Sequence, residues 1–354
     1  MKIKICAVAV LVALTTSLPA AAAPKSKVDP AYLRYEQPGI LAKIAGGQIV
    51  HLKCMGTGFP TVVLTAGMGD WAATWRKVQP QIARTTRVCA WDRPGFGFSS
   101  GTLKPQTVAA TTAALESALK IAHVRGPYIA VGHSLGGYES ILFKDRNPTA
   151  VVGMVLVDPS IPNQHTRLAL AAPQFAAFGD EYNAKNIAFF DGCLAGFRSG
   201  KLKLGSPDPD QCLAYAPDYP PELAKALAFR DTDPLRFTAG RSLLANFNSD
   251  GESVVNARRN FGDMPLIVLS ASKVSDAFVI PPAAKAQTAL FHAEFVRGHD
   301  ELASLSSRGV NRLVPDATHY IQNDQPQAVI EAISEVVAAA RSTSRSRNRR
   351  TTRH

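Results

Sequence analysis

Short apolar runs alternate with amphipathic stretches along most of the chain. Four of these runs are bounded by glycine, proline or polar residues and predict buried strands, namely 61–65, 87–91, 128–131 and 151–157. An earlier apolar alternation over 40–54, broken by two glycines, predicts a hairpin. Apolar residues between the runs recur at helical spacing. Strands that alternate with helices and are apolar on both faces form parallel sheets covered on both sides, so the pattern predicts an α/β domain.

The alternation stops after residue 160 and resumes with the apolar run 265–269. The interval 161–264 is too long for a structureless loop and is rich in aromatic residues, so we expect an inserted helical cap there. Aromatic side chains suit either the small core of such a cap or a lid over an apolar ligand. The body of the protein then consists of 24–160 and 265–340, and the second part ends in a helix.

Residues 1–23 have the pattern of an export signal. Lys2 and Lys4 precede an apolar run over 5–14, and small residues fill the positions up to Ala23. The apolar run is too short to span a bilayer comfortably. We therefore expect this signal peptide to be removed and the mature protein to be exported to the periplasm or the extracellular space.

The formal charge of +11 lies mostly at the two ends of the chain. Lys2 and Lys4 belong to the signal, and six arginines fall in the segment 341–354, which has no acidic residue. The rest has 31 basic and 28 acidic side chains, so the body is nearly neutral and we do not expect it to bind nucleic acid. The composition of 341–354 favours a disordered tail, with weak association with anionic surfaces as its alternative role. Nothing in the sequence predicts an oligomeric state.

Four cysteines remain after the signal: Cys54, Cys89, Cys193 and Cys212. An even number permits two disulfides in an oxidising compartment. We favour a bond between Cys193 and Cys212, because both lie in a loop-rich stretch with glycine, proline and aspartate. Cys54 and Cys89 then pair by elimination. The alternative is four buried thiols that pack like small apolar residues.

The segment Gly132-His-Ser-Leu-Gly-Gly137 directly follows an apolar strand and precedes a helix. A strand that reverses sharply into a helix can present a side chain only if its neighbours lack bulk, which explains the glycines two residues before and after Ser134. The helix N-terminus beside Ser134 offers free backbone N–H groups to a developing negative charge. The motif therefore predicts Ser134 as a nucleophile. An inert serine in a glycine-rich turn is the alternative.

With four further segments, this motif makes the chain resemble the α/β-hydrolase superfamily from about Ile40 to Ala340. These segments are Leu64–Trp71, Trp91–Ser99, Leu156–Pro159 and Thr318–Pro326. The resemblance implies the α/β-hydrolase fold, with an eight-stranded, mostly parallel sheet, helices on both faces and a helical cap inserted after the sixth strand. It also implies a nucleophile, an acid and a histidine in that order along the chain.

A serine hydroxyl is a poor nucleophile at neutral pH and needs a base within hydrogen-bond reach. His319 is our candidate, because it lies on a polar loop after the last strand, where the family places its histidine. A carboxylate must accept a hydrogen bond from this imidazole and fix its tautomer. Asp158, directly after the sixth strand, and Asp276, after the seventh, both qualify, and we favour Asp158.

The oxyanion of an acyl-transfer intermediate needs two backbone N–H donors. By position in the family these belong to Leu135 and Met68. Asp92 and Arg93 lie in a segment that packs loops together in relatives, so we assign them no chemistry. A serine rather than an aspartate at the turn argues against epoxide hydrolase or haloalkane dehalogenase chemistry. The sequence has no motif for metals, phosphates or dinucleotides, so neither a cofactor nor a metal is expected.

The sequence therefore predicts an exported serine hydrolase that cleaves a carboxylic ester or a related small-molecule acyl substrate. A proline-type aminopeptidase and an acyltransferase use the same groups and remain alternatives. An aminopeptidase needs carboxylates to hold a substrate ammonium, and the cap contains Asp180, Glu181 and Asp191. Outside enzymes, the alternative is a non-catalytic ligand-binding member of the fold.

Overall fold

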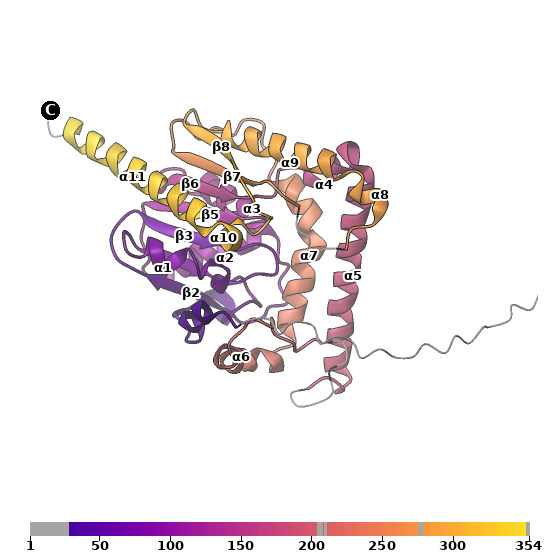
Figure 1. Ribbon diagram of the computed structural model, residues 1–354. Coiled ribbons are helices and arrows are strands. Elements are labelled where there is room, and N and C mark those ends of the chain that lie inside the picture. Colours follow the sequence, from indigo (N-terminus) through magenta and orange to yellow (C-terminus); the bar gives the residue numbers. More distant parts are fainter. Residues whose placement is uncertain (1–27, 204–207, 209–210, 275–278, 352–354) are drawn as a thin grey trace, which may run out of the picture.

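The computed structural model describes residues 28–203, 208, 211–274 and 279–351 (Figure 1). Its strands are β1 (Ile40–Lys43), β2 (Ile49–Met55), β3 (Thr61–Thr65), β4 (Val88–Trp91), β5 (Tyr128–His133), β6 (Val151–Val157), β7 (Leu266–Ala271) and β8 (Gly309–Val314). They form one eight-stranded sheet in the order β1-β2-β4-β3-β5-β6-β7-β8. β2 pairs antiparallel with β1 and β4, and the other pairs are parallel. The predicted α/β-hydrolase fold is therefore confirmed.

Helices cover both faces of the sheet. The helices of the body are α1 (Gln79–Ile82), α2 (Val108–Ile121), α3 (Gly136–Arg146), α8 (Pro282–Lys285), α9 (Thr288–Ala303), α10 (Ile321–Asp324) and α11 (Pro326–Thr351), with the short 3-10 helices η1 (Pro30–Tyr35), η2 (Ala45–Gly47) and η3 (Ala72–Trp75). Successive strand residues point to opposite faces. Leu64 accordingly lies in the core under α1 and α11, and its neighbour Val63 lies in the core under α2, α3 and α9.

The helical cap is formed by the chain between β6 and β7. Its elements in the described residues are α4 (Gln164–Ala171), α5 (Pro173–Arg198), α6 (Pro221–Leu227), η4 (Ala228–Thr232) and α7 (Leu235–Ser253). Figure 1 shows α5 and α7 side by side along one edge of the body, and the two helices are in contact. A small core that includes Leu194 and Phe237 fills the space between them. The predicted cap is therefore present at its expected place.

Contacts from several cap elements fasten the cap to the body, including one from α7 and one from α4. Asp250 of α7 accepts the backbone N–H of Val108 at 3.0 Å, which caps the first turn of α2. Arg167 of α4 forms an ion pair with Glu294 of α9, and both side chains are largely buried. Because these contacts lie on different cap helices, they fix the orientation of the cap as well as its position.

The structure contains both disulfides that the cysteine analysis predicts. Cys54 and Cys89 are directly opposite each other on β2 and β4. Cys193, near the end of α5, is bonded to Cys212 in the connection to α6, across a sequence separation of 19 residues. The second bond therefore ties α5 to the connection that leads into α6.

The C-terminal segment differs from its prediction. The last helix, α11, continues to Thr351, so residues 341–351 are helical and the expectation of a disordered tail is wrong for them. The part of α11 that packs on the sheet stabilises the helix, and each residue added beyond it gains a further backbone hydrogen bond. Arginine also has a high helix propensity. The predicted signal peptide 1–23 and residues 352–354 lie outside the described part of the chain. No helix within the described residues is long and apolar enough to cross a membrane.

We expect the double substitution Cys193→Ser/Cys212→Ser to lower the free energy of unfolding by roughly 3 kcal/mol, because the disulfide restricts the unfolded chain. Denaturant unfolding of the variant and the wild type measures this loss. The bond between Cys54 and Cys89 is still present in the variant. Unfolding of the chemically reduced variant therefore measures the contribution of that bond separately. Equal unfolding midpoints for variant and wild type would contradict the prediction.

Candidate active site

The turn between β5 and α3 presents Ser134 in a strained backbone conformation. Ser134 has a φ of 54°, in the left-handed region that residues with a Cβ rarely adopt. A Cβ on Gly132 would lie 2.1 Å from the carbonyl oxygen of Gly136, and a Cβ on Gly136 would lie 2.6 Å from that of Thr65. Only glycine fits at both positions, so the chain can turn sharply enough to leave the Ser134 side chain partly exposed.

Asp158 and His319 form the hydrogen bond that an acid and base pair needs. Asp158 directly follows β6, and its Oδ2 lies 2.7 Å from Nδ1 of His319. Its Oδ1 accepts the backbone N–H of Ala271 at 2.8 Å, which orients the carboxylate. Because the carboxylate accepts at Nδ1, that nitrogen carries the proton and Nε2 has the lone pair. Of the two acid candidates, the structure brings Asp158 to the histidine; Asp276 lies outside the described residues.

The surroundings of Asp158 keep it charged. Burial opposes ionisation, since Asp158 is only 8% exposed. The hydrogen bond from His319, the nearby imidazoles of His319 and His299 and the N–H of Ala271 outweigh the burial and hold the pKa of Asp158 below its ordinary value. The carboxylate is therefore ionised at neutral pH and can stabilise an imidazolium beside it.

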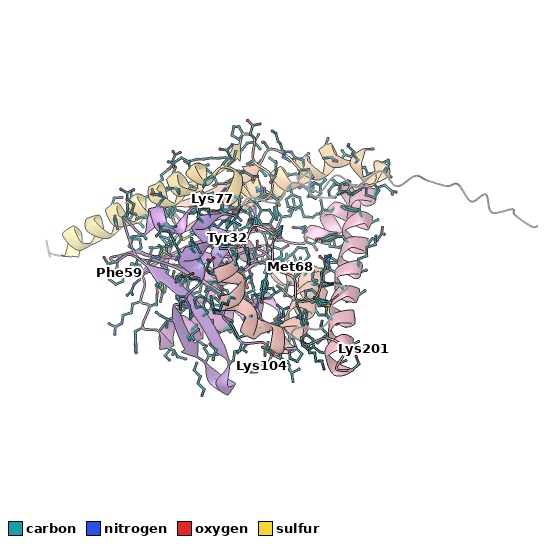
Figure 2. The ribbon with its side chains drawn as sticks, turned by 60° about the horizontal axis from the view of Figure 1, so that its bottom comes forward. Tyr32, Phe59, Met68, Lys77, Lys104 and Lys201 are labelled. Carbon is teal, nitrogen blue, oxygen red and sulfur yellow. A yellow bond between two sulfur atoms is a disulfide. The ribbon has the colours of Figure 1, made fainter. Side chains whose placement is uncertain are left out.

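The backbone N–H groups of Leu135 and Met68 are free to bind a ligand. Neither donates to a backbone acceptor within the described residues. Leu135 lies at the start of α3, where the helix dipole favours negative charge. Met68 lies in the loop after β3, and Figure 2 shows it near the middle of the molecule, between the sheet and the cap helices. Their role as the two oxyanion donors stays a prediction, since neither residue is among those that line the cavity beside Ser134.

A buried ion pair holds the loop that carries Met68. Arg93 donates to the carbonyl oxygen of Ala66 at 2.6 Å and to that of Gly67 at 2.8 Å. Its guanidinium also pairs with Glu139 of α3, and both side chains are almost fully buried. Arg93 thus has a loop-packing role, and no pattern in the sequence marks Glu139 as its partner.

Two buried histidines that the sequence analysis does not assign to the site support its loops. His133 Nε2 donates to the carbonyl oxygen of His319 at 2.8 Å, and His299 Nε2 donates to that of Pro159 at 2.8 Å. Burial, followed by the charge of His319, lowers the pKa of His133 to about 3, so its ring is neutral. The position of His133 inside the serine motif is the one sequence signal that could have revealed this role.

Ser134, Asp158 and His319 line the same cavity, which has a volume of about 270 Å³. The side chains that dominate its other walls are aromatic and come from α5, α7 and α9: Phe175, Phe178, Tyr182, Phe247, Phe291 and Phe295. Within the described ranges, no cluster of three or more His, Cys, Asp or Glu side chains could hold a metal ion. The arrangement therefore joins an activatable hydroxyl to an apolar binding space.

Whether Asp158 or Asp276 is the acid that pairs with His319 can be tested by measuring the nucleophilicity of Ser134. We expect Asp158→Asn to slow labelling by a fluorophosphonate probe by roughly 10³-fold or more, because the amide no longer stabilises the imidazolium or its tautomer. Asp276→Asn is the matched control and should label at the rate of the wild type. The opposite pattern would assign the acid to Asp276. Mass spectrometry of the labelled protein identifies the modified residue.

Comparisons with known proteins show which family this chain is similar to. Residues 62–332 match the family model described as the alpha/beta hydrolase family. Protein YqjL of Bacillus subtilis is 25% identical over 280 residues, which cover 79% of this chain and 84% of YqjL. The 2-hydroxy-6-oxo-2,4-heptadienoate hydrolase of Pseudomonas putida is 37% identical over 125 residues, or 32% of this chain and 42% of that enzyme. A Schizosaccharomyces pombe protein is 43% identical over 89 residues, and this match spans only 17% of its length.

Solved structures share the architecture at low sequence identity. Epoxide hydrolase CorEH superimposes with a TM-score of 0.58 and 18% identity, covering 85% of this chain and 98% of the enzyme. An esterase from Thermogutta terrifontis gives a TM-score of 0.54 and 17% identity, covering 86% and 99%. Likeness at this level of identity shows the fold alone. The family model, by contrast, spans most of the sequence, and the chain therefore belongs to the alpha/beta hydrolase family.

Proposed function

We propose that this protein is an exported serine hydrolase that cleaves carboxylic esters with a compact apolar acyl group, through an acyl-enzyme on Ser134. The observation that carries the proposal is that Ser134 shares an apolar cavity with the hydrogen-bonded pair of His319 and Asp158. A hydroxyl, an imidazole with its lone-pair nitrogen available and an ionised carboxylate are the three groups that acyl transfer to serine requires.

In the proposed reaction, Ser134 Oγ attacks the ester carbonyl carbon while Nε2 of His319 takes the hydroxyl proton. The N–H groups of Leu135 and Met68 donate to the oxyanion of the tetrahedral intermediate. As the intermediate collapses, the imidazolium returns its proton to the departing alkoxide and the acyl-enzyme remains. Water then attacks the acyl carbon, His319 accepts the proton of the water, and Ser134 leaves with that proton.

The cavity supports an apolar acyl group of limited size. A volume of about 270 Å³ lies just below the range of roughly 300 to 1,000 Å³ that is usual for small-molecule pockets. Two of its aromatic walls are braced against each other, since the Phe175 and Phe291 rings stack at 4.0 Å between centroids. A medium-length alkyl chain or a single aromatic ring fits such a space, and a long fatty chain would extend beyond it.

Three cap carboxylates that kept an aminopeptidase among the alternatives have other partners. The carboxylate of Asp180 contacts the imidazole of His165, Glu181 pairs with Lys185, and Asp191 pairs with Arg241. All three carboxylates are at least half exposed. None of them lines the cavity. Asp158 is the acidic residue among the described cavity residues, and it is engaged by His319. A substrate ammonium would therefore find no free carboxylate there, which favours an ester over a peptide substrate.

The remaining alternatives concern the fate of the acyl group. An acyltransferase would use the same acyl-enzyme and pass the acyl group to an alcohol or amine instead of water. A non-catalytic binding protein would fill the cavity without turnover. Export and weak association of the basic C-terminal segment with anionic surfaces stay part of the proposal, on the sequence pattern alone.

The proposed nucleophile is tested with p-nitrophenyl esters graded in acyl length. We expect the wild type to hydrolyse medium-length esters fastest and Ser134→Ala to lose the activity, because no other group can form the acyl-enzyme. Amino-acid arylamides serve as the comparison substrates and should turn over far more slowly. Full esterase activity in Ser134→Ala, or a preference for the arylamides, would refute the proposal.

The proposed acyl pocket is tested at Gly179 of α5, which lines the cavity and where an added Cβ would meet nothing within 4 Å. We expect Gly179→Leu to shift the preference toward shorter esters by occupying part of the cavity. Gly192 on the same helix also has open space but does not line the cavity, so Gly192→Leu is the matched control. Each variant should gain about 0.5 to 1 kcal/mol of stability from helix propensity. If Gly179→Leu and the wild type show the same dependence of hydrolysis rate on acyl length, the acyl group binds elsewhere.

A further inference from the structure

The connection between β6 and α4 lies directly against the turn that carries Ser134. The backbone N–H of Ser160 donates to the carbonyl oxygen of Ser134 at 3.0 Å. Ser160 and Gln164, the first residue of α4, both line the apolar cavity together with Ser134. Side chains of this connection can therefore reach the part of a bound acyl group that lies close to the reacting carbonyl.

Several other polar side chains of the cavity already have protein partners. The pairs are Asp158 with His319, Ser270 with His299 and Lys273 with Asp316. The imidazole of His292 donates to the carbonyl oxygen of Ala271 at 2.8 Å. By contrast, the hydroxyl group of Ser160 and the amide nitrogen of Gln164 have no hydrogen-bond partner within the described residues.

The burial of Ser160 makes this lack of a partner informative. Its side chain is part of a residue that is only 3% exposed, and it borders the cavity. A buried polar group without a partner is unfavourable, and native proteins retain few of them. Ligand pockets are the exception, because a few polar groups in an apolar wall fix the orientation of the ligand that pairs with them.

The orientation of the Gln164 amide decides which chemistry it can recognise. Oε1 accepts the backbone N–H of Ile161 at 3.2 Å, so Nε2 at the other end of the amide is left as a donor without a lone pair. Ile161 directly follows Ser160, so the amide nitrogen and the Ser160 hydroxyl are neighbours. A hydroxyl can also donate. The group that pairs with both must therefore be an acceptor, such as an ether or ketone oxygen.

Backbone contacts hold the two donors in place. The carbonyl oxygen of Ile161 accepts the hydroxyl of Tyr138 at 2.7 Å. The N–H of Asn163 donates to the carbonyl oxygen of Gly251 in α7 at 2.8 Å. The connection is therefore anchored both to α3 of the body and to the cap, and little further ordering of the chain is needed when an acceptor binds.

We propose that Ser160 and Gln164 are specificity-determining residues that donate hydrogen bonds to an ether or ketone oxygen in the acyl group, a few atoms from the ester carbonyl. The inference rests on the proposed function and narrows its substrate class to esters of acids that carry one such oxygen and are otherwise apolar. The aromatic walls of the cavity bind the apolar remainder of the acyl group.

The test compares p-nitrophenyl esters of nearly equal size. In the pentanoate the acyl chain is all carbon, and in the ethoxyacetate and the 3-methoxypropanoate an ether oxygen replaces one methylene. Each kcat/KM is divided by the rate of hydroxide hydrolysis, which removes the intrinsic reactivity of the ester. We expect Ser160→Ala and Gln164→Met each to lower kcat/KM for the better ether ester, relative to the pentanoate, by roughly 3-fold or more, because a neutral hydrogen bond is lost.

Ser270→Ala is the matched control. Ser270 is a buried serine on the same cavity, and its hydroxyl already has His299 and Asn311 as partners. Its loss should leave the ratio of ether ester to pentanoate at the wild-type value. If Ser160→Ala and Gln164→Met lower kcat/KM for all the esters by one common factor, the two side chains do not recognise the acyl oxygen and the inference is overturned.

Equilibrium binding separates this inference from the proposed function. The Kd of each ester is measured by ligand-observed NMR with Ser134→Ala and with Ser134→Ala/Ser160→Ala, neither of which has the proposed nucleophile. We expect the second substitution to weaken binding of the ether ester selectively. If the wild type hydrolyses none of the esters but this selective loss is observed, the proposed function fails and the inference stands. An unchanged ratio of the Kd values overturns the inference, whether or not the protein hydrolyses esters.

Discussion

The turn at Ser134 is the constraint on which the rest of the site depends. Two carbonyl oxygens lie so close to Gly132 and Gly136 that neither position can hold a side chain. The strand can therefore enter the helix without an intervening loop, and the backbone strain falls on the residue between them. The surrounding sheet maintains this strain, because β5 is hydrogen-bonded to β3 and β6 along its length. The turn thereby keeps the Ser134 side chain at the cavity that His319 also lines.

The groups around this turn are held by buried contacts between segments that are far apart in the sequence. Arg93 reaches from the loop after β4 to Glu139 and to the carbonyl oxygens of the loop after β3. Removing one partner of such a pair leaves a buried charge, which typically costs about 3 to 5 kcal/mol. The nearby carboxylate of Asp92 accepts the backbone N–H groups of Ala72 and Phe98. The loops are thus stabilised by fixed charges that take no part in the proposed reaction.

Much of the fold could be predicted, because local patterns encode it. The apolar runs mark buried strands, and the serine motif works through the size of its own neighbours, so both are visible in a short window. Glu139 and His133 could not be predicted, because their roles depend on partners that only the folded chain brings near. The helical course of 341–351 was missed for a related reason: its composition is polar, but it continues a helix already stabilised by packing. The preference for Asp158 follows from its place directly at the end of the sixth strand, and the hydrogen bond to His319 agrees with it.

The walls of the apolar cavity and its reacting groups belong to different layers of the molecule. Ser134, Asp158 and His319 follow strand ends, whereas four of the six aromatic side chains come from the cap helices α5 and α7 and two come from α9 of the body. Mutations in the cap can therefore accumulate without disturbing proton transfer, and mutations in the sheet are restricted by packing on both faces. This separation lets a lineage keep one reaction while it explores new ligands, so we expect sequence divergence among relatives to concentrate in the inserted helices.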